Sequence, residues 1–281
     1  MNLIENQTYD AERSLYNLCD TAVNNCVFAG PADGESVLKE TRNISVDNCV
    51  FSLRYPIWHA KNYCLKNSKM DDKTRAAIWY CDNGIIENSS LYGVKALREC
   101  NNTVISDCDI VSTEFGWKTD RTKITKSSLV SEYVFLYSKN ITIKDLEFKG
   151  KYSFQYTENV LIENSNLDTK DAFWHSKNVT VKNSVIKGEY LAWFSDGLTL
   201  IDCKIIGTQP LCYCKNLTLK NCEMVSCDLS FEYSDVSATV SGHIDSVKNP
   251  RSGKIIADTI GEIILEDSIM ESKAEIISRK P

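Results

Sequence analysis

The chain has 281 residues, of which 43% are apolar and 25% are charged, and its formal net charge is −6. This acidic balance speaks against sequence-independent binding of nucleic acid, which needs a basic surface to displace counterions from phosphates. No run reaches the roughly 20 apolar residues of a membrane-spanning helix, and the first residues lack the basic and apolar regions of a secretory signal. We therefore expect a cytoplasmic protein with neither nucleic acid nor membrane as a partner.

Twelve cysteines are spread along the chain. They do not form the CxxC pairs of a zinc site, and the closest two, Cys212 and Cys214, are only two positions apart. Most fall at equivalent places in the repeat described next, where small inward-facing residues stack. We expect buried free thiols in a reducing compartment, with no metal and no cofactor.

The chain is organised as one repetitive domain. Residues 1–19 form a lead-in, residues 20–235 regular coils, and residues 236–281, where the repeat decays, a cap over the open end. One column of the repeat advances in steps of 19 residues, except for a step of 21 from Asn62 to Asn83, where two extra residues fall in the polar stretch Met70 to Lys73. This column comprises Asn62, Asn83, Asn102, Arg121, Asn140, Asn159, Asn178, Gly197 and Asn216.

Within each unit, β-branched residues alternate with polar ones, as in Ile141 and Ile143 or Val179 and Val181. A period of two with such residues is typical of a strand with one buried face. Nineteen residues leave no room for a strand, a helix and a second strand, and the frame of a leucine-rich repeat is absent. The sequence therefore predicts an all-β, single-stranded, right-handed parallel β-helix with coils of about 19 residues.

Stacking of the coils explains the recurring polar residues. Equivalent residues of successive coils lie about 4.8 Å apart, so the asparagine column predicts a ladder of side-chain amides. Cys81 above Cys100 and Cys203 above Cys222 are further stacked pairs. These ladders are architectural and are removed from the candidates for function.

The strand before the asparagine column differs from the others. Four residues before that column lies a tryptophan column, with Trp58, Trp79, Arg98, Trp117, Gln155, Trp174 and Trp193. Three residues before it lies a tyrosine column, with His59, Tyr80, Glu99, Lys118, Tyr137, Tyr156 and His175. Strict alternation favours the tryptophan column inside, with the tyrosine column and the column of Ile57, Phe135, Phe154 and Phe173 outside. The opposite assignment stays open, because a slip of one residue inverts every side chain.

This strand predicts an aromatic stripe interrupted by charge. Sugar rings stack on aromatic faces, while carboxylates and amides bind their hydroxyls, so the stripe indicates oligosaccharide binding. The candidate binding residues are His59, Tyr80, Arg98, Tyr137, Tyr156, Gln155, Asp171 and His175. Two alternatives stay open: the rings stabilise the sheet by cross-strand packing, or they form an apolar patch for self-association.

Two adjacent coils carry Lys95 and Glu99, then Glu114 and Lys118. These four residues are the candidate catalytic groups, with the glutamates as general acid and base. Their Cα atoms would lie about 14 Å apart, whereas the carboxyl pairs of glycosidases are about 5–9.5 Å apart. The other interpretation is two salt bridges, Glu99 with Lys118 and Lys95 with Glu114. His59 and His175 lie six coils apart and cannot share one site.

Several segments carry a resemblance to a known family: residues 6–8, 32–36, 53–59, 96–100, 150–156, 171–175 and 209–214. Over essentially its whole length the chain resembles the bacterial family called domain of unknown function 3737. The resemblance implies a pectin-lyase-like right-handed β-helix and no assigned activity. Two functions remain open: a protein that binds an oligosaccharide and perhaps processes it, as a glycosidase or polysaccharide lyase does, or a non-catalytic scaffold that associates with itself as a homodimer.

Overall fold

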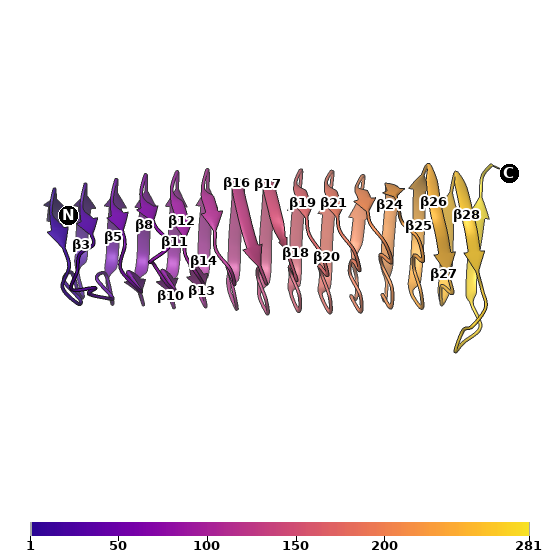
Figure 1. The fold of residues 1–281 in the computed structure, drawn as a ribbon, viewed down its shortest axis with the longest axis horizontal. Coiled ribbons are helices and arrows are strands. Elements are labelled where there is room, and N and C mark those ends of the chain that lie inside the picture. The colour runs from indigo at the N-terminus through magenta and orange to yellow at the C-terminus, as the bar shows by residue number, and fades with distance from the viewer. Residues whose placement is uncertain (1, 281) are drawn as a thin grey trace. The chain divides into compact units, whose positions relative to one another are not determined.

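A computed structural model describes residues 2–280 of the chain, so Met1 and Pro281 lie outside the described residues. The described residues form strands, turns and loops without a helix, and hence none that could span a membrane. The chain packs into two compact units that divide between Thr142 and Ile143. Within each unit, parallel strands of successive coils lie side by side (Figure 1). The predicted all-β parallel solenoid is confirmed.

In the first unit, each coil has a long strand followed by a short one, except that the single strand β16 pairs with both strands of the preceding coil. The long strands are β1 (Asn2–Glu5), β3 (Cys19–Asn24), β5 (Arg42–Asp47), β8 (Lys61–Lys66), β11 (Asp82–Glu87), β14 (Asn101–Ser106) and β16 (Asp120–Glu132). The short strands are β2 (Thr8–Tyr9), β4 (Val27–Phe28), β6 (Val50–Phe51), β9 (Lys69–Met70), β12 (Ser90–Tyr92) and β15 (Asp109–Val111). A third side carries β7 (Ile57–Trp58), β10 (Ile78–Trp79) and β13 (Leu97–Arg98).

Strand β17 (Lys139–Lys151) contains the boundary between the units. The second unit continues with β18 (Glu158–Glu163), β19 (Asn166–Asp168), β20 (Lys177–Lys182), β21 (Val185–Lys187), β22 (Thr199–Ile201), β23 (Lys204–Ile206) and β24 (Leu217–Val225). Its last strands are β25 (Asp235–Ser241), β26 (His243–Lys248), β27 (Ser252–Ala257), β28 (Thr259–Ile264) and β29 (Lys273–Ser278). In the segment where we expected a cap, β25, β27 and β29 continue the parallel pairing.

The asparagine ladder is present as predicted. The side-chain amide of Asn62 donates to Asn43 at 2.9 Å, Asn83 donates to Asn62 at 2.9 Å, and Asn102 donates to Asn83 at 2.8 Å. These asparagines have φ between 52° and 57°, a left-handed conformation that asparagine tolerates better than most residues. All twelve cysteines are free, and all but Cys19 and Cys64 are buried.

The favoured alternation on the third side is wrong. Ile57, Phe135, Phe154 and Phe173 have no solvent exposure and form the core, whereas the tryptophan column is only half-buried. The reason lies in the tyrosine column, whose residues have positive φ, for example 53° at Tyr80. Because the chain turns there, two consecutive side chains face outward before the next one is buried, and period two fails. The tyrosine column does face solvent, with Tyr137 at 57% exposure.

Candidate functional site

On the third side of the first unit, cations and indoles form one continuous stack. The ammonium of Lys39 lies 4.1 Å from the ring centroid of Trp58, and Trp58 stacks on Trp79 at 5.5 Å. The guanidinium of Arg98 follows, 5.6 Å from the rings of both Trp79 and Trp117. Cation–π attraction of this kind stabilises each contact by about 0.5–1 kcal/mol where it is partly exposed. Arg98 is therefore held in a fixed orientation between two indoles.

Glu99 is the centre of a polar network beside this stack. The Nε of Arg98 donates to the Glu99 carboxylate at 3.1 Å, and the hydroxyl of Tyr80 donates to it as well. Burial favours the neutral acid, but these two hydrogen bonds and the charges of Arg98 and Lys118 outweigh it and hold the pKa of Glu99 below its ordinary value. A general acid must carry a proton near the working pH, so Glu99 is suited to accept hydrogen bonds and not to donate a proton.

The remaining catalytic candidates form one of the two predicted salt bridges. The ammonium of Lys95 lies 3.3 Å from a carboxylate oxygen of Glu114. Glu99 has its ion pair with its neighbour Arg98, and Lys118 acts on it through its charge. Three of the four candidates are thus engaged in ion pairs, and the fourth, Lys118, acts on Glu99 through its charge.

The two histidines of the tyrosine column have different surroundings. In the first unit, Nδ1 of His59 lies 2.8 Å from a carboxylate oxygen of Glu40. In the second unit, the ring of His175 stacks on Tyr156 at 4.8 Å and on Phe194 at 5.0 Å. Among residues 2–280, no three His, Cys, Asp or Glu side chains are grouped as metal ligands would be.

Stacking in the second unit changes what the aromatic stripe can bind. Neighbouring rings of Tyr156, His175, Phe194 and Tyr213 are 4.8–5.0 Å apart and nearly parallel, at 8–15°. Both faces of His175 and Phe194 are therefore covered by the next rings, and the exposed parts are ring edges. A sugar stacks on a ring face, so this stripe is a poorer sugar platform than the sequence suggested.

Two further candidates lie beside this ring stack. The side-chain amide of Gln155 donates to the backbone carbonyl of Asp171 at 2.8 Å. Asp171 itself is 7% exposed, and burial raises the pKa of its carboxyl. Gln155 thus fixes the backbone of the coil, and the Asp171 carboxyl is largely withdrawn from solvent.

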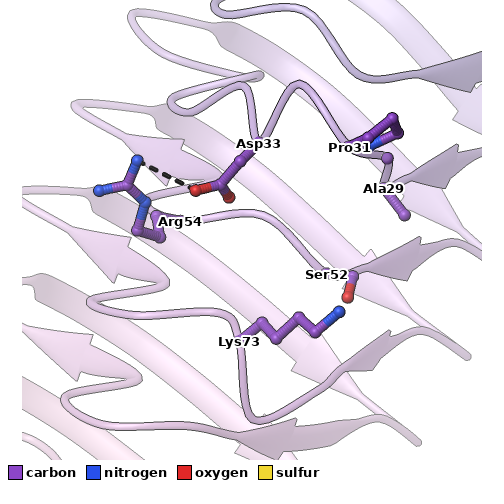
Figure 2. A pocket seen from close by; sticks show the side chains of 7 residues that line it. Ala29, Pro31, Asp33, Ser52, Arg54 and Lys73 are labelled. Carbon is purple, nitrogen blue, oxygen red and sulfur yellow. Dashed lines mark ion pairs between the residues drawn. The ribbon is translucent and has the colours of Figure 1, made fainter.

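The first unit has a concave site at the corner between the short strands and the third side. We call it the corner pocket; its volume is about 550 Å³. It is lined by Ala29, Gly30, Pro31, Asp33, Ser52, Arg54 and Lys73 (Figure 2). Sites for small ligands typically enclose about 300–1,000 Å³, so the corner pocket has room for one or two sugar residues.

Coil lengths explain why the pocket forms at this corner. Strand pairing places Cys19 beside Arg42 and Lys61 beside Asp82, so these coils advance by 23 and 21 residues. Between them, Arg42 pairs with Lys61, an advance of 19. The extra residues of the two longer coils project at the corner, and the shorter coil, with Ser52 and Arg54, forms the floor between them. Glycine suits position 30, since its φ is 155° and a Cβ there would lie 2.3 Å from the Asp10 carboxyl.

The corner pocket contains donors and acceptors of both charges. Arg54 pairs with Asp33 at 3.3 Å and with Glu35 at 3.6 Å. The hydroxyl of Ser52 donates to Asp71 at 2.5 Å. Figure 2 shows Lys73 reaching from its coil toward Ser52, and its ammonium forms no ion pair with the described residues. The pocket thus offers one uncommitted cation beside a carboxylate, a guanidinium and a hydroxyl.

The chain is similar to one protein family and, weakly, to several solved structures. A family model described as "Protein of unknown function (DUF3737)" matches residues 2–278. No curated protein matches the sequence. Solved structures with some likeness include three proteins, all at 10% identity. They are the A-module of the Azotobacter vinelandii mannuronan C-5 epimerase AlgE6 (85% of this chain, 89% of that chain, TM-score 0.36), the Streptococcus pneumoniae surface adhesin PfbA (90%, 72%, 0.33) and bacteriophage CBA120 tailspike protein 3 (98%, 51%, 0.27). All three TM-scores are below 0.5, so neither the fold nor the function is inferred from these likenesses.

Proposed function

The chain belongs to the DUF3737 family, and we propose that this member binds an oligosaccharide in the corner pocket without cleaving it. The observation that carries the proposal is the chemistry of the pocket. A sugar hydroxyl donates one hydrogen bond and accepts others, so a sugar site needs donors and acceptors side by side. The carboxylate of Asp33, the hydroxyl of Ser52 and the ammonium of Lys73 supply both kinds of group within one cavity.

The walls of the pocket suit the rest of a sugar residue. Ala29 and Pro31 contribute apolar surface against which the C–H groups of a pyranose can pack. Tyr55 follows Arg54 directly, and its ring centroid lies 6.1 Å from that of Trp58 and 6.2 Å from that of Trp79. A chain of sugar residues that leaves the pocket on this side meets Tyr55 and then the polar network of Glu99 and Arg98.

We favour binding over catalysis because of the state of the acids. The lowered pKa of Glu99 makes it an acceptor, and Glu114 is paired with Lys95. The acids beside the pocket are also engaged, Asp33 and Glu35 with Arg54 and Asp71 with Ser52. Hydrolysis or elimination needs a proton donor or an unengaged base near the scissile bond, and these pairings favour neither.

A glycan array with matched variants tests the proposal. Lys73→Met removes the uncommitted donor and is expected to abolish or strongly weaken binding to the array. Lys61→Met is the control, because Lys61 is an exposed lysine of the same unit that does not line the pocket. Equal binding by the wild type and the Lys73→Met variant, or no binding to any glycan, would refute the proposal.

Self-association is the second candidate function. The exposed ring edges of Tyr156 and Phe194, at 44% and 45% exposure, favour it, since they leave apolar area on one side of the second unit. Sedimentation of the wild type and of Phe194→Ser tests this candidate. A dimer that the substitution dissociates supports self-association, and a monomeric wild type contradicts it. We also propose a cytoplasmic location, supported by the free and mostly buried thiols.

A further inference from the structure

We infer that the corner pocket selects uncharged sugar residues and discriminates against uronic acids, an inference that rests on the proposed function. The basis is the balance of charge around the cavity. Asp33 lines the cavity, and the carboxyls of Asp10, Glu35 and Asp71 lie beside the lining residues Gly30, Arg54 and Ser52. Against these four carboxylates stand the two lining cations Arg54 and Lys73.

The guanidinium in the pocket already serves two carboxylates. One of its terminal nitrogens, Nη2 of Arg54, lies 3.3 Å from Asp33 and 3.6 Å from Glu35. Arginine binds carboxylates through a planar fork of donors, so a ligand carboxylate that used both terminal nitrogens would compete with these two residues for Nη2. An uncharged hydroxyl does not compete for the fork, because it can donate to Asp33 while the ion pair stays in place.

The other carboxylates are also fixed in position. Asp71 accepts hydrogen bonds from the Ser52 hydroxyl, at 2.5 Å, and from the backbone N–H of Lys73, at 3.0 Å. Asp10 accepts from the backbone N–H of Ala32 at 2.8 Å, and its other oxygen is buried without a hydrogen-bond partner. These backbone contacts hold negative charge beside the cavity whether or not a ligand is bound.

Lys73 remains as the single uncommitted cation. One ammonium neutralises one ligand carboxylate, but a uronate in the pocket would also lie beside the carboxylate of Asp33, which lines the cavity, and charges this close are little screened because the Debye length is about 8–10 Å. For a sugar without charge, the same ammonium is a hydrogen-bond donor and the surrounding acids are acceptors. Asp33 and Glu35 are thus the residues that determine specificity. Lys73 donates a hydrogen bond to a sugar whether or not the sugar is charged.

The test compares tetramers of galactose, glucose and mannose with tetramers of galacturonate, glucuronate and mannuronate. Dissociation constants are measured by calorimetry with the full chain at low salt. We expect the tightest uncharged tetramer to bind at least about tenfold better than its uronate, a ratio typical for a ligand charge placed near a charge of the same sign. The Asp33→Asn, Glu35→Gln double variant should reduce this ratio toward one, mainly by improving uronate binding.

Glu158→Gln serves as the control, because Glu158 is an exposed glutamate of the second unit, outside the pocket. It removes one negative charge and should leave the ratio unchanged. Thermal unfolding of each variant shows that it is folded; Asp33 is 61% exposed, so little loss of stability is expected. If a uronate binds the wild type as tightly as its uncharged counterpart, the inferred discrimination is wrong, although the proposed sugar binding still holds. If none of the six tetramers binds, the proposed function itself fails.

Discussion

Replacing Phe173 with alanine tests which side chains of the third side form the core. Phe173 has no solvent exposure, and its ring stacks on Phe154 with centroids 5.1 Å apart and planes at 12°. Truncation of a fully buried phenylalanine typically costs about 3–5 kcal/mol, because apolar burial is lost and a cavity remains. We expect the free energy of unfolding to fall by an amount in this range.

Phe194 provides the matched control, since it is a phenylalanine of the adjacent coil that is 45% exposed. Its ring contacts His175 and Tyr213 at 5.0 and 4.8 Å, so Phe194→Ala should cost about 1–2 kcal/mol from half-burial and lost ring contacts. Urea unfolding followed by circular dichroism gives both values. If Phe194→Ala were as destabilising as Phe173→Ala, the assignment of the buried column would be refuted.

Three further predictions concern buried or paired titratable groups. Burial raises the pKa of Asp171 in the folded state, so its contribution to stability is full below the unfolded value of about 3.9 and is lost as the pH rises. Asp171→Asn should therefore raise the melting temperature at pH 7 but not at pH 3, and an unchanged value at pH 7 would contradict this. The pKa of Glu99 is lowered, so its stabilisation is present above about pH 4.3 and is lost in acid. Glu99→Gln should lower the melting temperature at pH 7, and a loss as large at pH 2 would count against the network. In the native protein, a thiol reagent should modify at most Cys19 and Cys64 quickly, and all twelve cysteines after unfolding; fast reaction of a third thiol would show that the core is open.

Much of the fold follows from the sequence because stacking places equal residues above one another. The steps of 19 residues predicted both the parallel coils and the hydrogen-bonded asparagines, since a repeated side chain meets its own kind in the next coil. The Lys95–Glu114 ion pair was predicted for the same reason. Arg98 and Glu99 were not paired in advance, because adjacent residues of a regular strand point to opposite faces.

The third side could not be predicted by alternation, since that rule assumes φ values of the β region throughout. Tyr80, Glu99 and their equivalents adopt positive φ, which is uncommon outside glycine and asparagine and is not signalled by tyrosine or glutamate. Of the two longer coils that form the corner pocket, the sequence indicated only one. The two extra residues near Asp71 were evident from the asparagine steps, but the column from Asn62 to Asn216 does not include the longer coil from Cys19 to Arg42.

The central claim is that a sugar binds in the corner pocket, and methyl-resolved NMR of the alanines tests it most directly. Ala29 lines the pocket, whereas Ala172 and Ala192 are buried on the third side of the second unit. On titration with the tetramer that binds most tightly, we predict that the Ala29 methyl resonance shifts in proportion to occupancy while Ala172 and Ala192 do not move. Shifts at the indole N–H groups of Trp174 and Trp193, with Ala29 unmoved, would contradict the account and place the ligand on the aromatic stripe.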